Sequence, residues 1–168
     1  MQDIKHPRLI SCLEFFETKQ GFCLVRDYKK APSLAEIHSL PPERIKPIIM
    51  SILEILADMQ KRVPPFIHGN IKPENVLIDY DLNAYLVDWG LDRIGGGKAT
   101  GIPGFMPPEQ QFNPSPSLTS DLYSLGATLI CLLTGTSSAD IGKFVDSSYR
   151  LNFKGLLPQL NPRFISWL

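Results

Sequence analysis

One stretch decides the fold: His68-Gly69-Asn70-Ile71-Lys72-Pro73-Glu74-Asn75. It is polar and lies between a long helical pattern and a short apolar run. Four shorter motifs follow it along the chain: Val76-Leu77-Ile78, Val87-Asp88-Trp89-Gly90, Pro107-Pro108-Glu109 and Ser120-Asp121. Any one of these pieces could be an ordinary polar loop between a helix and a hairpin. Their order and spacing together favour one site built from several loops.

Two helices are predicted from hydrophobic patterning. Apolar residues recur at three- and four-residue steps over residues 42–62, which predicts the longest helix. The run 120–133 is more uniformly apolar, which predicts a helix in the core. We expect that helix to be capped by Thr119 or Ser120 and to end at Gly135.

The other predicted elements are short. Apolar runs rich in β-branched and aromatic residues, bounded by turn residues, predict strands. We expect strands at 9–14, 22–28, 76–78 and 84–87, a long loop at 88–112 and a last helix that starts at Asn161-Pro162.

The motifs together resemble the protein-kinase signature H-R-D-x-K-x-x-x-N, D-F-G and A-P-E, followed by the aspartate of a later helix. The resemblance covers nearly the whole chain and is similar in pattern to bacterial kinases of the eukaryotic type. It implies an α+β, protein-kinase-like fold, with a mainly helical C-lobe and a remnant of the N-lobe β-sheet. Residues 1–29 would be that remnant, with strands 4 and 5 and the hinge. Residues 30–168 would be the C-lobe, truncated in its last helices.

The resemblance implies catalytic roles for Asn70, Lys72, Asn75 and Asp88. Phosphoryl transfer needs metal ions across the phosphates, a cation near the transferred group and a positioned hydroxyl. Asn75 and Asp88 match the residues that hold Mg²⁺, an ion that prefers oxygen ligands. Lys72 would stabilise charge on the phosphoryl group, the alternative being a solvated surface lysine.

Cofactor-binding roles are implied for Asp27, Lys29, Leu77 and Asp88. The Asp27 carbonyl and the Lys29 amide would meet the adenine edge. Leu77 would form the floor under adenine, or serve in ordinary core packing. Arg26 falls at the gatekeeper position, where kinases usually carry an apolar or neutral side chain. The expected cofactors are ATP and Mg²⁺, provided that nucleotide binding is retained.

Three residues depart from the kinase pattern. Asn70 stands where kinases carry the aspartate that orients and deprotonates the substrate hydroxyl, and an amide cannot take a proton at neutral pH. General-base catalysis contributes roughly 10²- to 10⁴-fold, so we expect activity to fall by about that factor. Ile102 replaces a threonine that bonds to the catalytic aspartate and lysine. Gly69 replaces the arginine that would bind a phosphorylated residue of the activation loop.

Other motif residues are expected to be structural. We expect His68 to stack under Trp89 in a hydrophobic column, without a catalytic role. Asp121 resembles the buried aspartate that fixes the catalytic loop through its backbone amides, a role that requires hydrogen bonds to the carboxylate. Glu109 matches a residue that usually pairs with an arginine on a later helix.

The nucleotide-gripping parts of a kinase N-lobe are not found in the 168 residues. There is no G-x-G-x-x-G on a leading strand, no strand-borne lysine and no helix with a pairing glutamate. A two-stranded hairpin is marginal alone. The two predicted N-terminal strands would therefore expose apolar edges unless something covers them.

Composition limits the partners. Seventeen Lys and Arg balance seventeen Asp and Glu, which argues against nucleic-acid binding. The apolar stretch Leu122–Leu133 is interrupted and falls short of the ~20 residues that span a bilayer, so we expect no membrane segment. Cys12, Cys23 and Cys131 are odd in number and far apart, as is typical of buried thiols in a reducing compartment. We expect a cytoplasmic chain with a protein substrate or a regulated protein partner.

Two functional hypotheses follow. The first is a Ser/Thr protein kinase-like domain that is catalytically impaired, a pseudokinase or kinase fragment with a regulatory or binding role. The alternative is an active Ser/Thr kinase that transfers the ATP γ-phosphate to protein Ser/Thr, with the missing N-lobe supplied elsewhere. Lys72-Pro73-Glu74 favours Ser/Thr over Tyr specificity under either hypothesis.

Overall fold

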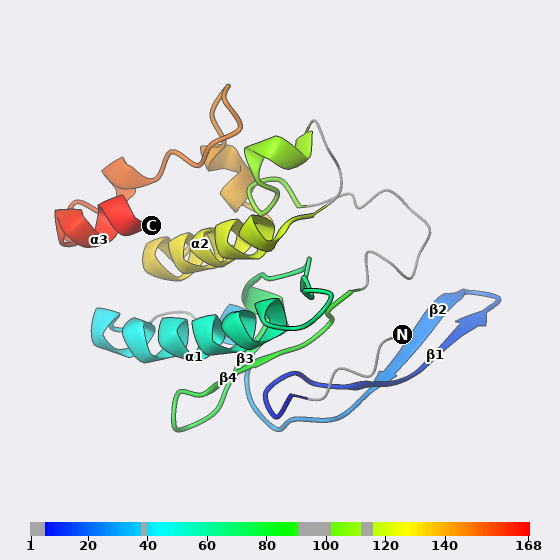
Figure 1. The fold of residues 1–168 in the computed structure, drawn as a ribbon. Coiled ribbons are helices and arrows are strands. Elements are labelled where there is room, and N and C mark those ends of the chain that lie inside the picture. Colours follow the sequence, from blue (N-terminus) through cyan, green and yellow to red (C-terminus); the bar gives the residue numbers. More distant parts are fainter. Residues whose placement is uncertain (1–5, 38–39, 91–101, 112–115) are drawn as a thin grey trace.

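Two helices lie side by side at the centre of the fold (Figure 1). They are α1 (Pro42–Gln60) and α2 (Leu118–Thr134) of a computed structural model that describes residues 6–37, 40–90, 102–111 and 116–168. Residues 91–101 and 112 of the loop predicted at 88–112 lie outside the described residues. The shorter elements are β1 (Cys12–Thr18), β2 (Gly21–Arg26), η1 (Leu34–Glu36), η2 (Pro73–Asn75), β3 (Val76–Ile78), β4 (Ala84–Leu86), η4 (Pro108–Gln111), η5 (Ile141–Phe144), η6 (Lys154–Leu156) and α3 (Pro162–Trp167).

α1 confirms the helix predicted from apolar periodicity. Its inner face is buried and consists of Ile45, Ile48, Ile49, Ile52, Ile55, Leu56 and Met59. Proline suits its first turn, where an N–H would have no partner within the helix. The helix ends at Gln60 rather than Arg62, and Phe66 N–H then bonds to the Met59 carbonyl at 3.1 Å. The Met59 carbonyl also accepts the Arg62 N–H at 3.4 Å, so this carbonyl at the helix end has partners.

α2 begins earlier than the sequence predicted. Its N-cap is Ser117, whose backbone N–H donates to the Ser120 hydroxyl at 2.9 Å in a capping box. The predicted cap at Thr119 or Ser120 is therefore wrong, because several consecutive hydroxyls compete for one local role. The predicted end at Gly135 is confirmed. Gly135 has φ 69°, and its N–H bonds to the Cys131 carbonyl.

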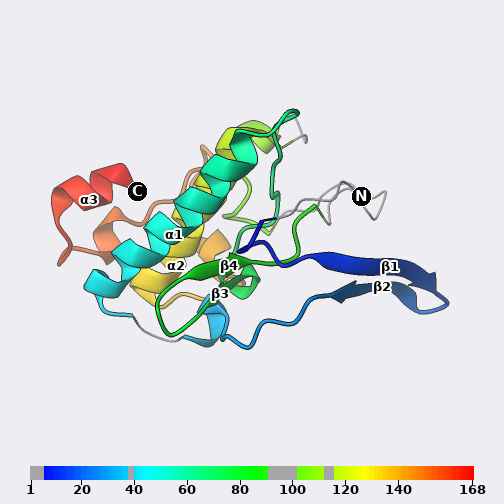
Figure 2. The ribbon, with the colours of Figure 1, turned by 60° about the horizontal axis from the view of Figure 1, so that its bottom comes forward.

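The β1–β2 hairpin reaches away from the helices (Figure 2). Its strands are antiparallel, with Phe16 opposite Cys23. β1 runs over 12–18, not 9–14 as predicted, and β2 ends at Arg26, not Tyr28. Large apolar side chains of the hairpin are exposed, namely Leu13, Phe15, Phe16, Phe22 and Val25.

Residues before β1 tie the hairpin to β4. Leu9 is buried and forms a parallel bridge with Leu86. Ile10 N–H donates to the Leu86 carbonyl, and Leu86 N–H donates to the Arg8 carbonyl, both at 2.9 Å. This bridge is the reason that the first strand starts late, because residues 8–10 pair with β4 and not with β2.

β3 and β4 form a second hairpin beneath α1. Val76 pairs with Leu86 and Ile78 with Ala84, and all four side chains are buried. In the turn between the strands, Asp79 Oδ1 accepts the Asn83 N–H at 2.9 Å. The strand after the turn leads directly into Asp88, so the hairpin sets where this motif begins.

The C-terminal part packs on the other side of α2. A second buried cluster there consists of Phe105, Ala127, Ile130, Cys131, Ile141, Phe153 and Leu157. The last helix begins where predicted, since Asn161 caps α3 by accepting the Arg163 N–H at 2.9 Å. The structure thus has the mixed α+β architecture expected from the sequence.

Candidate active site

The loop at 68–75 is fixed from below by the first turn of α2. Asp121 accepts the backbone N–H of His68 at 2.8 Å and that of Gly69 at 2.9 Å, one on each carboxylate oxygen. Its side chain is buried, at 3% exposure. A carboxylate is favoured near a helix N-terminus, and here the two backbone donors offset its burial. This geometry is the one expected for Asp121.

His68 is fully buried beneath the loop. Its Nδ1 accepts the Asn70 N–H at 3.2 Å, and its carbonyl accepts the Gly90 N–H at 3.0 Å. Burial lowers the pKa of His68 from 6.5 to about 3, so the ring stays neutral at physiological pH. The ring that contacts Trp89 edge-on is Phe66, at 5.2 Å between centroids. His68 itself bonds to the motif that contains Trp89 through its backbone carbonyl, which accepts the Gly90 N–H.

Asn70 lies between the loop and the Asp88 motif. Its Nδ2 donates to the Asp88 carbonyl at 3.3 Å, and its own carbonyl accepts from Asn75 Nδ2 at 2.8 Å. Asn75 is buried, and its carbonyl accepts the Val87 N–H at 3.1 Å. Three residues that the sequence assigned to catalysis therefore converge through direct hydrogen bonds.

A small cavity of about 60 Å³ is lined by both Lys72 and Asn70. Ile102 lines the same cavity, together with Phe105 and Ser124. In the kinase pattern, a threonine at position 102 would bond to the residues at positions 70 and 72. The structure places all three at one hollow, with an isoleucine where a hydroxyl would be needed to bond to Asn70 or Lys72.

Asp88 has an unusual backbone and a charged partner. Its φ is 60°, in the left-handed region that few non-glycine residues adopt, and such strain is often found at functional sites. Its Oδ1 forms an ion pair with Nη1 of Arg26, at the end of β2. The side chains are 42% exposed for Arg26 and 25% for Asp88. Sequence reasoning flagged Arg26 as an unusual gatekeeper but did not predict this contact.

The oxygens of Asn75 and Asp88 suit Mg²⁺ in kind. In the arrangement present, however, one Asp88 oxygen is already bound by a guanidinium. Within residues 6–37, 40–90, 102–111 and 116–168, no group of three or more His, Cys, Asp or Glu side chains could hold a metal ion. The permanent positive charge of Arg26 at the predicted ligand Asp88 does not fit a bound Mg²⁺ in this arrangement.

The residues predicted to meet adenine lie along the segment after β2. Asp27 N–H donates to the Ser11 carbonyl at 3.0 Å, and Lys29 Nζ lies 3.8 Å from the ring centroid of Tyr85. Leu77 is half-buried and bridges to Ser33. Asp27, Lys29 and Leu77 line none of the three cavities that we describe.

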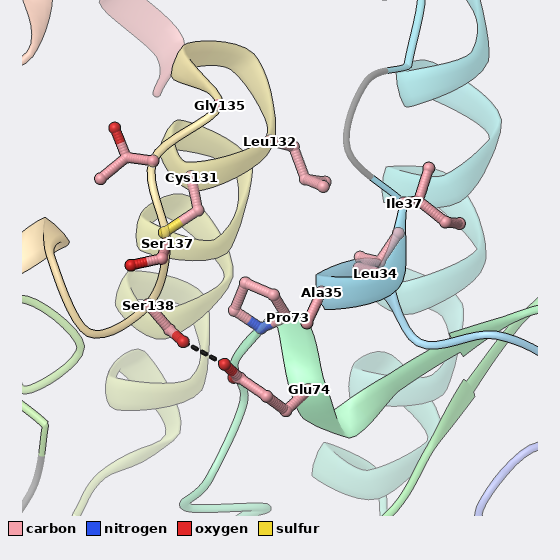
Figure 3. A pocket seen from close by; sticks show the side chains of 11 residues that line it. Leu34, Ala35, Ile37, Pro73, Glu74, Cys131, Leu132, Gly135, Ser137 and Ser138 are labelled. Carbon is pink, nitrogen blue, oxygen red and sulfur yellow. Dashed lines mark hydrogen bonds between the residues drawn. The ribbon is translucent and has the colours of Figure 1, made fainter.

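Two larger cavities lie outside the predicted site. One, of about 330 Å³, opens between η1, η2 and the end of α2, and there the Ser138 hydroxyl bonds to the Glu74 carboxylate (Figure 3). Burial raises the pKa of the Cys131 thiol in its wall to about 12. The other, of about 550 Å³, is lined by residues on either side of η1 and by the β3–β4 turn. Sequence patterns missed both cavities, because each is made by side chains from three separate segments.

Comparison with known proteins identifies the class. The model of the protein kinase domain matches residues 1–151, and the chain belongs to the protein kinase family. Similar proteins include the serine/threonine-protein kinase pkn2 of Myxococcus xanthus, 28% identical over 93% of this chain and 19% of that protein. Serine/threonine-protein kinase D of Synechocystis is 35% identical over 76% of this chain and 27% of that protein. Serine/threonine-protein kinase cds1 of Schizosaccharomyces pombe is 28% identical over 81% and 33%.

The chain spans a third or less of the length of these relatives. In the part of the chain that the structure describes, no helix is both long and apolar enough to cross a membrane.

Proposed function

We propose that the chain is a Ser/Thr protein kinase-like domain with impaired phosphoryl transfer, and that it acts by binding a protein. The position of Asn70 carries the proposal. Its side chain bonds to the Asp88 carbonyl, its backbone bonds to Asn75, and it shares a cavity with Lys72. A kinase needs a proton acceptor at this position, and a carboxamide accepts hydrogen bonds but no proton.

The remaining residues can still position a substrate. Asn70 can orient a hydroxyl through its amide oxygen, and Lys72 can place positive charge beside a transferred phosphoryl group. In the family, ATP supplies that group and Mg²⁺ neutralises its charge. Without a base, the hydroxyl would have to lose its proton to water, so transfer would be slowed by roughly 10²- to 10⁴-fold.

A protein partner is proposed on the basis of the family and of the surface near the loop. Lys72-Pro73-Glu74 supports Ser/Thr specificity, in line with the relatives named above. The cavity in Figure 3 adjoins this segment through Glu74 and has an apolar wall that includes Leu34 and Leu132. Such a concave surface beside the catalytic loop suits a peptide segment.

A second candidate function is an active Ser/Thr kinase whose remaining N-lobe is supplied elsewhere. The exposed apolar side chains of β1 and β2 favour it, because further strands or a helix would cover them. Under this reading residues 1–29 are the N-lobe remnant with the hinge, and residues 30–168 are the C-lobe. A glycine-rich loop and a Val-Ala-x-Lys strand encoded immediately upstream would support this candidate.

The test of the proposed function is transfer from radiolabelled ATP to a generic protein substrate. We expect the wild-type chain, alone and within any longer protein that contains it, to transfer phosphate far below the typical kinase kcat of roughly 1–100 s⁻¹. A rate within that range would overturn the proposal. Thermal-shift titration with ATP separates a retained nucleotide site from a lost one, because a ligand that binds only the folded state raises its melting temperature.

A further inference from the structure

Backbone contacts fix the positions of both Arg26 and Asp88, independently of the ion pair between them. Arg26 is the last residue of β2 and pairs with Cys12 of β1, and the next residue, Asp27, donates its N–H to the Ser11 carbonyl at 3.0 Å. The direction in which the Arg26 side chain leaves the sheet is therefore set by the strand pairing, because successive side chains of a strand point to opposite faces.

Asp88 is held from both sides. Val87 N–H bonds to the Asn75 carbonyl at 3.1 Å, and Gly90 N–H bonds to the His68 carbonyl at 3.0 Å. Between them, the Asp88 carbonyl accepts from Asn70, and its backbone adopts φ 60°. A strained conformation that is held by several hydrogen bonds fixes the direction of the side chain.

The hairpin is tied to the core close to this motif. Trp89 Nε1 donates to the Ile10 carbonyl at 3.0 Å, and Ile10 N–H donates to the Leu86 carbonyl at 2.9 Å. These bonds join the segment leading into β1 to the residues on both sides of Asp88. These bonds place the end of β2 beside the Asp88 carboxylate. The ion pair therefore joins two residues whose positions are set by the backbone.

We propose that Arg26 takes the place of the divalent cation at Asp88, so that this site is closed to Mg²⁺ and Mn²⁺. The inference rests on the proposed function, to which it adds a second reason for impaired transfer that is independent of Asn70. Arg26 is the residue that determines which cation lies at the Asp88 carboxylate. It supplies the positive charge at a carboxylate that a metal would otherwise neutralise.

Electrostatics favour this exchange of one cation for another. The guanidinium carries a permanent positive charge and donates directly to Asp88 Oδ1. A divalent ion at Asp88 would have to displace this donor or bind the other carboxylate oxygen, and in either case it would lie beside the positive charge of Arg26. The second predicted ligand, Asn75, offers only a neutral amide oxygen. It adds no negative charge that could offset this repulsion.

The test is Mn²⁺ binding to the purified chain without nucleotide, followed by the paramagnetic resonance of free Mn²⁺. We expect no Asp88-dependent binding to the wild type. Arg26→Met removes the charge while keeping a side chain of similar length, and we expect it to bind Mn²⁺ at least about tenfold more tightly. The added binding should disappear in the Arg26→Met, Asp88→Asn double variant.

Three controls make the result decisive. Arg26→Lys keeps a positive charge and should remain closed, whereas Arg26→Gln should open the site as Arg26→Met does. Arg163→Met changes an exposed arginine on α3 and should leave Mn²⁺ binding as in the wild type. The variants should fold, because a partly exposed ion pair contributes only about 0–1 kcal/mol to stability; melting temperatures verify this.

Two outcomes would overturn the inference: Asp88-dependent Mn²⁺ binding by the wild type, or absence of such binding in both folded Arg26→Met and folded Arg26→Gln. Neither outcome bears on Asn70. A kinase-typical transfer rate would instead overturn the proposed function, so the two failures are distinguishable.

Discussion

Asn75 holds Asn70 in place, since its Nδ2 donates to the Asn70 carbonyl at 2.8 Å across one turn of the loop. Its own carbonyl accepts the Val87 N–H at 3.1 Å, so one buried residue joins the loop at 68–75 to the Asp88 motif. Asn75 thus supports the position of Asn70 relative to Asp88, beside the direct bond from Asn70 Nδ2 to the Asp88 carbonyl.

The Asn75→Ala variant should lose stability as well as site geometry. The substitution removes the donor to the Asn70 carbonyl and leaves that partly buried acceptor without it, which costs about 1–3 kcal/mol. Urea unfolding measures the loss. Asn152→Ala, at an exposed position, is the control and should change stability by less than about 0.5 kcal/mol. Equal stability of the two variants would contradict the bond's role.

The Asp121→Asn variant tests how the loop is fixed. A carboxamide presents only one oxygen, so it can accept from His68 or Gly69 but its NH₂ group faces the other N–H. We expect a loss of about 1–3 kcal/mol in the free energy of unfolding. Asp81→Asn, in the exposed β3–β4 turn, is the matched control and should be close to neutral. A loss no larger than that of the control would show that the two bonds contribute little.

These two bonding networks mark the limit of what local patterns could predict. The periodicity of α1, the glycine that ends α2 and the asparagine that starts α3 are local features, and all three were predicted. The strand bounds of the first hairpin were wrong, because Leu9 bridges to Leu86, far along the chain.

The candidate site was likewise predicted in part. The order of its motifs identified Asn70, Asn75 and Asp88, which the structure joins by hydrogen bonds. The ion pair between Arg26 and Asp88 was missed, because it depends on how the hairpin approaches the loop and no short motif records that approach.

His68 predicts a pH dependence of stability. Its folded-state pKa, about 3, lies below its ordinary value of 6.5, because burial disfavours the charged ring. The unfolded chain therefore binds the proton first, and stability is lost as pH falls from 6.5 towards 3. The slope should be roughly 1.4 kcal/mol per pH unit.

Urea unfolding in the upper part of this window, above the ordinary range of carboxylates, measures the slope. His68→Gln should flatten it, even if the variant is less stable at every pH. His6→Gln is the control with a smaller effect, because Asp58 partly offsets the desolvation that lowers the pKa of His6. A slope unaffected by His68→Gln would mean that another group takes up the proton.

Asn70 and Ile102 should behave as one coupled pair. Both line the cavity of about 60 Å³, so a hydroxyl at position 102 can bond to residue 70, and this bond is strongest when residue 70 is a carboxylate. Ile102→Thr alone should leave transfer from ATP unchanged, whereas it should raise transfer further in the Asn70→Asp background. A double-mutant cycle should give a coupling energy of about 0.5–3 kcal/mol. Simple additivity of the two substitutions would place the residues in separate roles.

The most direct measurement is the rate of phosphoryl transfer from radiolabelled ATP by Asn70→Asp relative to wild type, in the same protein and with the same generic substrate. Asn152→Asp, which adds an equal charge at an exposed position, is the control. If a missing proton acceptor limits transfer, Asn70→Asp should raise the rate by roughly 10²- to 10⁴-fold while Asn152→Asp changes nothing. An Asn70→Asp substitution that leaves the rate unchanged in both the native and the Arg26→Met background, with each variant folded and ATP bound, would contradict the account.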